Sequence, residues 1–108
     1  MEVDRAVRIA RSNILEVEVF LGCDEKNVLK LRNELLYRIP QMSSAETSYA
    51  VGNDQTKPQG HCVTGDAMVK ADEVERFKTD IRNLVRALKD EGIEVTNTEI
   101  LVENNGIK

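Results

Sequence analysis

The sequence is poor in aromatic residues and cysteine, and it contains no tryptophan. Aromatic residues make up 4% of the 108 positions, so a hydrophobic core has to be built mainly from Leu, Ile and Val. Apolar residues reach 41%, which is enough for one core without stabilising cross-links. A chain of this length fits one domain, and we expect residues 1–108 to form a single α+β domain.

Long apolar runs are also missing, and none approaches the roughly 20 residues that a membrane-spanning helix needs. The charged residues 1–5 are not followed by the apolar stretch of a signal peptide. Two cysteines, Cys23 and Cys62, make no disulfide framework. These absences predict a cytoplasmic protein without membrane contact. The formal net charge of −4 argues against general binding to nucleic acid.

The first regular elements are a strand and a helix. Residues 14–21 alternate with period two, which predicts a half-buried strand that ends at Gly22. Its expected core-facing side chains are Leu15, Val17, Val19 and Leu21. Asp24 is expected to cap the following helix, and Pro40 to stop it. The apolar positions of that helix are Val28, Leu31, Leu35 and Ile39.

A hairpin with a long tip comes next. Residues 46–51 are predicted to form a strand with Thr47, Tyr49 and Val51 toward the core, and residues 61–70 to form its partner. Residues 52–60 are rich in turn-forming residues and predict the connecting loop. In the second strand, one face carries His61, Val63, Ala67 and Val69, and the other carries Cys62, Thr64, Asp66 and Met68.

The second helix has the strongest apolar periodicity in the chain. Asp72 and Glu75 are spaced as in a capping box, and Gly92 stands where a helix-ending glycine is expected. The apolar stripe is Val74, Phe77, Ile81, Leu84, Val85 and Leu88. Residues 93–102 predict a final strand whose alternation slips near Asn97, at a β-bulge. Residues 1–12 predict a short helix or arm, and residues 103–108 a frayed tail.

The order strand, helix, strand, strand, helix, strand resembles the ferredoxin-like βαββαβ arrangement. That resemblance implies a four-stranded antiparallel sheet with two helices on one face. The first and third strands would then be the central neighbours. The resemblance concerns element order only, and many unrelated functions share this order.

The sheet face without helices is predicted to carry mostly polar side chains. By alternation they are Glu16, Glu18, Glu46, Ser48, Cys62, Thr64 and Asp66. Glu16, Glu18 and Asp66 are expected to lie close together, within reach of a cation or a basic partner. RNA-binding proteins of this architecture stack bases on aromatic side chains of the two central strands. Only Phe20 is available here, among carboxylates, which disfavours RNA recognition. The alternative interpretation is an ordinary solvated face.

No catalytic, cofactor-binding or metal-binding motif is present in the sequence. Cys23 is predicted at a helix start, where a thiol can become reactive, but the adjacent Asp24 opposes thiolate formation. His61 and Cys62 are neighbours on a strand and point to opposite faces, so they cannot form a catalytic pair. With Asp66 they match no zinc spacing. We therefore assign no catalytic residue, no metal and no cofactor.

The second helix also has a basic stripe at spacings of three and four residues. Its members are Lys78, Arg82, Arg86 and Lys89. This stripe could contact phosphate or an acidic partner. The alternative is a solvated helix face, because Glu73, Glu75, Asp80 and Asp90 are interleaved with the basic residues.

Two hypotheses of function follow. The favoured one is a small non-enzymatic interaction or accessory protein, a homodimer, that binds a protein partner through its acidic sheet face; such profiles are common among small proteins of bacteria and their phages. The alternative is a small-molecule-binding protein or simple enzyme with a pocket near residues 52–66 or at a dimer interface. Its candidate residues are His61 as acid–base, Asp66 as its orienting group and Lys57 as an anion contact.

Overall fold

The computed structural model describes residues 13–50 and 60–103. The elements are β1 (Ile14–Cys23), α2 (Val28–Arg38), β2 (Met42–Ala50), β3 (Gly60–Lys70), the 3-10 turn η1 (Ala71–Glu73), α3 (Val74–Asp90) and β4 (Val95–Glu103). The fold is α+β, and the order of strands and helices is the predicted one. The helix or arm expected over residues 1–12, Val51, Lys57 and residues 104–108 of the predicted tail lie outside the described residues. The prediction that the tail begins at residue 103 was wrong, because Glu103 is the last residue of β4, which also begins at Val95 and not at residue 93.

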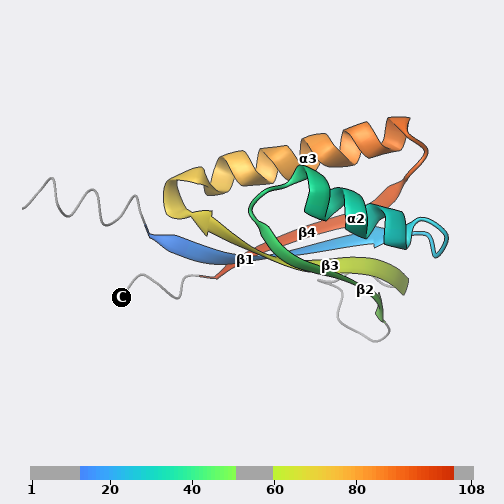
Figure 1. Cartoon of the computed structure of the whole chain (residues 1–108), viewed down its shortest axis with the longest axis horizontal. Coiled ribbons are helices and arrows are strands. Elements are labelled where there is room, and N and C mark those ends of the chain that lie inside the picture. Colours follow the sequence, from blue (N-terminus) through green and yellow to red (C-terminus); the bar gives the residue numbers. More distant parts are fainter. Residues whose placement is uncertain (1–12, 51–59, 104–108) are drawn as a thin grey trace, which may run out of the picture.

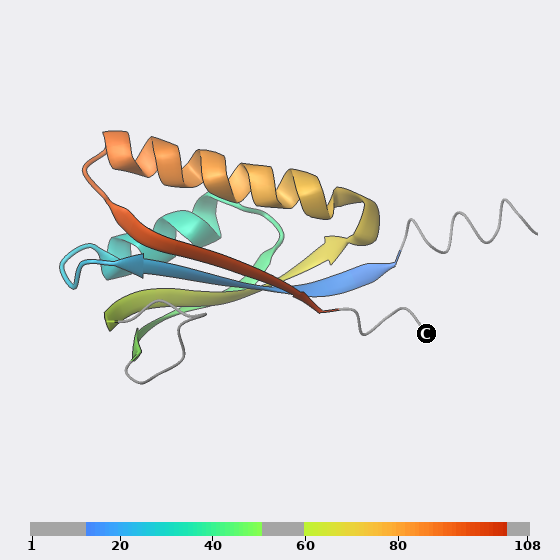
Figure 2. The same cartoon turned by 180° about the vertical axis from the view of Figure 1, so that it is seen from behind.

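The four strands form one antiparallel sheet in the order β2-β3-β1-β4. Both helices cover the same face of this sheet, and no helix of the described residues lies on the opposite face (Figure 1). The view from behind shows the same two layers, with β4 running beside β1 (Figure 2). In the part of the chain that the structure describes, no helix has the length and apolar composition needed to cross a bilayer.

β1 sorts its side chains between the two faces as its alternation predicts. Val17, Val19 and Leu21 are fully buried beneath the helices, while Glu16 is exposed on the other face. The strand continues past Gly22 to Cys23, so the predicted end at Gly22 was wrong. The expected irregularity near Asn97 is confirmed, because the β1–β4 register shifts between Gly22 and Cys23, opposite Asn97 and Val95.

The predicted side-chain caps of the helices were wrong. α2 begins at Val28 after Asn27, and Asp24 contributes only its carbonyl oxygen, which accepts a hydrogen bond from the Asn27 amide at 3.1 Å. Asp72 lies within η1, and α3 begins after Glu73 without a side-chain cap. In both places a turn of backbone leads into the helix. The spacing of polar residues alone could not reveal these turns.

The end of α3 follows the predicted glycine-dependent pattern. Gly92 has a φ of +88°, a backbone conformation that glycine adopts without steric cost. Its amide donates to the Lys89 carbonyl at 3.1 Å, and the Ile93 amide donates to the Leu88 carbonyl at 2.8 Å. These two bonds form a Schellman motif. Ile93 and Leu88 are both buried in the core, so the same motif that ends α3 also directs the chain toward β4.

β2 differs most from its prediction. It begins at Met42, four residues earlier than expected, because Met42 packs into the core and the Met68 amide donates to the Gln41 carbonyl at 3.2 Å. Thr47 and Tyr49 were predicted to face the core, but both are exposed. The register does place them on the helix side, opposite Val63 and His61. β2 is an edge strand, and these residues have no helix above them.

β2 packs closely against Gly65 in β3. Gly65 is buried opposite Val19 on one side and Ala45 on the other. A Cβ atom at this position would lie 2.5 Å from Cε of Met42 and 2.8 Å from the Ser44 carbonyl oxygen. The start of β2, where its register against β3 is irregular, therefore occupies the space that a side chain would need.

We expect Gly65→Ala to lower the free energy of unfolding by about 1–3 kcal/mol, the usual cost of overpacking. At an unobstructed strand position the same change would instead stabilise the chain slightly, through the unfolded state. Urea denaturation measures the effect, and a large-to-small core variant, Leu88→Ala, gives the scale for a 2–5 kcal/mol loss. Unchanged or increased stability of Gly65→Ala would show that β2 does not pack against Gly65 in this way.

Candidate functional site: the acidic open face of the sheet

The face of the sheet opposite the helices, here called the open face, carries the even-numbered residues of β1 and β3. The antiparallel register aligns them in rows, with Glu16 beside Met68, Glu18 beside Asp66, and Phe20 beside Thr64. β2 extends two of these rows with Ser44 and Glu46. The residues predicted on this face are therefore brought together on it, as the alternation of β1 and β3 requires.

β4 adds residues to the open face that the sequence prediction did not include. Glu99, Leu101 and Glu103 lie beside Phe20, Glu18 and Glu16. The bulge near Asn97 shifts the alternation of β4, and its faces could not be assigned without the register. Residues 99, 101 and 103 alternate with the apolar Ile100 and Val102, and that pattern was the available signal.

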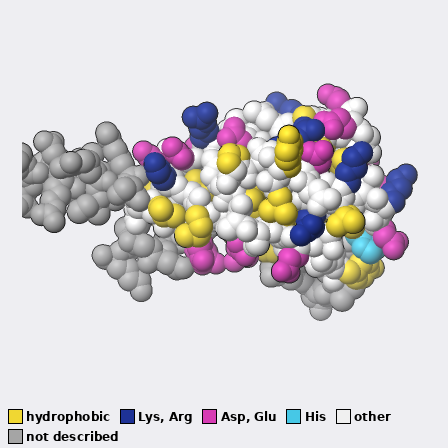
Figure 3. Space-filling view, viewed as in Figure 1, with side chains coloured by type: hydrophobic (Ala, Val, Ile, Leu, Met, Phe, Trp, Pro, Cys, Tyr) yellow, Lys and Arg dark blue, Asp and Glu magenta, His cyan; other side chains and the backbone are white. Residues whose placement is uncertain are grey.

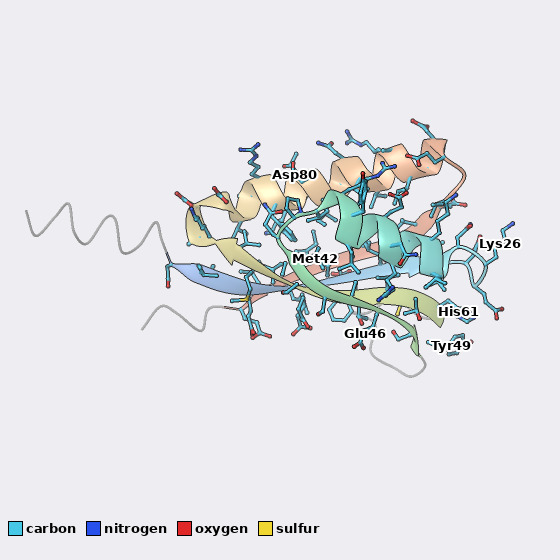
Figure 4. The ribbon with its side chains drawn as sticks, viewed as in Figure 1. Lys26, Met42, Glu46, Tyr49, His61 and Asp80 are labelled. Carbon is cyan, nitrogen blue, oxygen red and sulfur yellow. The ribbon has the colours of Figure 1, made fainter. Side chains whose placement is uncertain are left out.

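Carboxylates dominate the charge of the open face. They come from all four strands and are Glu16, Glu18, Glu46, Asp66, Glu99 and Glu103. Among the described residues of this face the only cation is Lys70, at the far end beside Ile14. In Figure 3 the charged side chains along the lower border, beneath the sheet, are acidic, whereas most Lys and Arg lie higher, over the helix layer. Figure 4 shows Glu46 pointing away from the helices.

Apolar side chains are interspersed with these carboxylates. Ile14, Met68 and Leu101 are 51%, 49% and 42% exposed, and the register places all three on the open face. Phe20 lies at the centre and is buried. The face thus combines negative charge with apolar area, a composition that suits contact with another protein better than simple hydration.

A depression of about 360 Å³ lies at the centre of the open face. Its walls include the carboxylates of Glu18, Glu46 and Asp66, and its lining includes Phe20 and Thr64. The size suits one long side chain or a small molecule. Carboxylates around an aromatic ring favour a cationic group, because both the negative charges and the ring attract it.

The charge of this face has a cost in stability. Glu18 and Asp66 lie directly opposite each other on neighbouring antiparallel strands, and like charges in that position are destabilising. The fold tolerates this repulsion because the two groups are on the open side of the sheet, where water screens them.

We therefore expect Asp66→Asn to raise the free energy of unfolding by about 0.5 kcal/mol at low salt, through relief of this repulsion. The gain should shrink when salt screens the charges. Thermal denaturation at two salt concentrations checks both parts. Exposed Glu94→Gln, which lies outside the sheet and away from a helix N-terminus, is the matched control. A loss of stability in Asp66→Asn, or a gain independent of salt, would contradict this view of the open face.

The structure does not bring together His61 and Asp66, two residues of the alternative small-molecule site. His61 and Asp66 lie on opposite faces of β3, because they are an odd number of residues apart in one strand. His61 instead contacts the ring of Tyr49, with centroids 4.8 Å apart, and its Nε2 lies 3.9 Å from a carboxylate oxygen of Glu25. Figure 4 places His61 and Tyr49 together at one end of the sheet. Lys57, the third residue of that hypothesis, is outside the described residues.

Both cysteines are buried and unpaired by disulfides. Cys23 is the last residue of β1, five positions before α2 begins, so its predicted place at a helix start was wrong. Burial raises the pKa of the Cys23 thiol, a backbone hydrogen bond with Asp24 partly offsets this rise, and the charge of Asp24 adds a smaller upward effect. Cys62 is 1% exposed, and its Sγ lies 3.1 Å from Oγ of Ser48.

We expect both thiols to react with a disulfide reagent at pH 8 at least about tenfold more slowly in the native protein than in denaturant. The raised pKa has a second consequence: the unfolded thiol ionises first, so raising the pH above about 8.5 should lower stability. Cys23→Ser should remove that pH dependence. Rapid native labelling of Cys23 would show that it is an accessible, reactive thiol.

The basic stripe of α3 lies on the side of the molecule opposite the open face. Phe77, Ile81 and Leu88 of α3 point into the core, and Arg82, Arg86 and Lys89 are exposed on the other side of the helix. Lys78 is half-buried, with Nζ 3.8 Å from a carboxylate oxygen of Glu75. Within the described residues, no carboxylate lies within ion-pair distance of the other three basic side chains.

Comparisons with protein-family models, with curated proteins and with solved structures found no match. Residues 13–50 and 60–103 also hold no group of three or more His, Cys, Asp or Glu side chains arranged to bind a metal ion. The acidic open face, with its central depression, is the strongest candidate site that the geometry provides.

Proposed function

We propose that this protein is a non-enzymatic binding module whose open face docks a cationic segment of a partner protein. The observation that carries the proposal is the sign of the charge on that face, which, among the described residues, comes from carboxylates on all four strands with one lysine at the far end. We also infer a ferredoxin-like arrangement, supported by the element order and by β1 and β3 at the centre of the sheet. Action in the cytoplasm, where free thiols stay reduced, fits the proposal.

The cationic segment would be bound in two ways. A lysine or arginine side chain enters the central depression, between Glu46 and Asp66 and toward the ring of Phe20. Apolar side chains of the same segment contact Met68 and Leu101, which are half exposed on either side of β1. Charge would then set orientation and association rate, and the apolar contacts would contribute to residence time.

An arginine-rich peptide with interspersed leucines tests the proposal. Its dissociation constant is measured by fluorescence anisotropy for the full chain and for a triple variant, Glu46→Gln, Asp66→Asn and Glu99→Gln. Each exposed ion pair contributes about 0.2–1 kcal/mol, so loss of three pairs should weaken binding by about 3- to 150-fold. The difference should decrease at high salt.

A matched variant controls for net charge. It removes three carboxylates that are exposed and outside the sheet, by Glu73→Gln, Asp90→Asn and Glu94→Gln. Binding within about twofold of the unmodified chain is expected for this control, because distant exposed charges are screened. If the control variant lost as much affinity as the open-face variant, the peptide would be responding to net charge and the proposal would fail.

A further inference from the structure

The basic stripe of α3 and the carboxylates of the open face have opposite charge and similar lengths. The stripe from Lys78 to Lys89 spans eleven residues of α3, or about 16 Å at the rise of an α-helix. On the open face, the rows from Glu16 to Glu99 are four residues of β1 apart, or about 14 Å along a strand. The basic stripe is thus about as long as the rows of carboxylates on the open face, and it lies on the opposite surface of the molecule.

We infer that a second copy of this chain docks on the open face with its α3 basic stripe. This inference rests on the open face of the proposed function and names one partner for it. Arg82, Arg86 and Lys89 are exposed and without ion pairs in the described part of the chain. They can therefore meet the carboxylates of another copy without first giving up an internal partner.

The same charges select between two modes of self-association. A symmetric dimer that pairs two open faces brings carboxylates such as Glu46 and Asp66 against those of the partner, which costs free energy at neutral pH. Contact of α3 with the open face joins two different surfaces. Each pair of copies therefore keeps one free basic stripe and one free open face. Such a contact is heterologous, and it continues from copy to copy as an open stack.

The apolar residues of the open face contribute to the same contact. Met68 and Leu101 are half exposed between the carboxylates, and the aliphatic stems of arginine and lysine cover apolar surface while their charged ends reach outward. An arginine stripe laid across this face therefore covers its apolar area as well as pairing its charges.

Sedimentation of the full chain at low and high salt tests the inference, with two charge-reversed variants. One changes four open-face carboxylates to Lys, by Glu16→Lys, Glu46→Lys, Asp66→Lys and Glu99→Lys. The other changes the stripe to Glu, by Lys78→Glu, Arg82→Glu, Arg86→Glu and Lys89→Glu. Circular dichroism checks that each variant is folded, and variants with only the two central reversals (Glu46→Lys with Asp66→Lys, or Arg82→Glu with Arg86→Glu) replace any that is not.

The unmodified chain is expected to show an average mass that keeps rising with concentration at low salt and falls at high salt. Each reversed variant alone should associate at least about tenfold more weakly, since its two surfaces then carry the same sign. An equimolar mixture of the two variants restores opposite signs across the contact. Its mass should return to that of the unmodified chain.

Three results would overturn the inference: a monomer at low salt, a mass that stops at a dimer, or a mixture that fails to reassociate. The arginine-rich peptide distinguishes this failure from failure of the proposed function. A monomer that still binds the peptide through Glu46, Asp66 and Glu99 would mean that the open face serves another cationic protein. A monomer that does not bind it would remove both proposals.

Discussion

The whole arrangement depends on β1, which is hydrogen-bonded on both sides and contributes side chains to both faces of the sheet. β3 and β4 pair with its two edges, and its odd-numbered residues supply the centre of the core. A slip of one residue in either pairing would move Glu16 and Glu18 beneath the helices and Val17 and Val19 into water. The cost of burying these carboxylates fixes the register, and the register in turn creates the acidic face.

The sequence predicted those features that follow from side-chain burial. Period two in β1 and β3, the apolar stripe of α3 and the glycine at its end each report how one element packs, and each is found in the structure. Even the faces of Glu46, Thr64 and Asp66 could be assigned in this way, because strand alternation is a local property. The acidic open face could be predicted from the sequence for the same reason.

The features that the sequence did not predict depend on backbone geometry or on distant neighbours. Asp24 and Asp72 are of a residue type that often caps helices, but turns of backbone occupy those positions. Tyr49 is a residue type that often packs into a core, yet neither α2 nor α3 covers it. Glu99 was missed because the irregularity near Asn97 reverses the alternation of β4. Glu103 was missed because it was predicted to belong to the frayed tail, whereas β4 extends to it. Whether a residue lies under a neighbouring element cannot be inferred from its own segment alone.

The basic stripe and the carboxylates of the open face lie on different layers of this protein. Hydrophobic contacts between α3 and the sheet leave the helix free to carry cations on its outer side, and the sheet free to carry anions on its own. Ion pairs within the helix layer, such as Arg38 with Glu34 and Glu91, join α2 to the end of α3. These ion pairs involve none of the carboxylates of the open face.

The exposed second half of β2 has a consequence for how the open face adapts to what binds it. α2 reaches β2 through the Arg32 side chain, which donates to the Ala45 carbonyl at 2.9 Å, and beyond that point Thr47 and Tyr49 are exposed on the helix side. This part of the strand is held by β3 along one edge only, and segments with so few buried apolar contacts open at lower free energy than the core. Glu46 stands at its start and forms one wall of the central depression. One side of the depression is therefore built on an edge strand with few buried contacts, and it can shift to fit an occupant while β1 and the core remain in place.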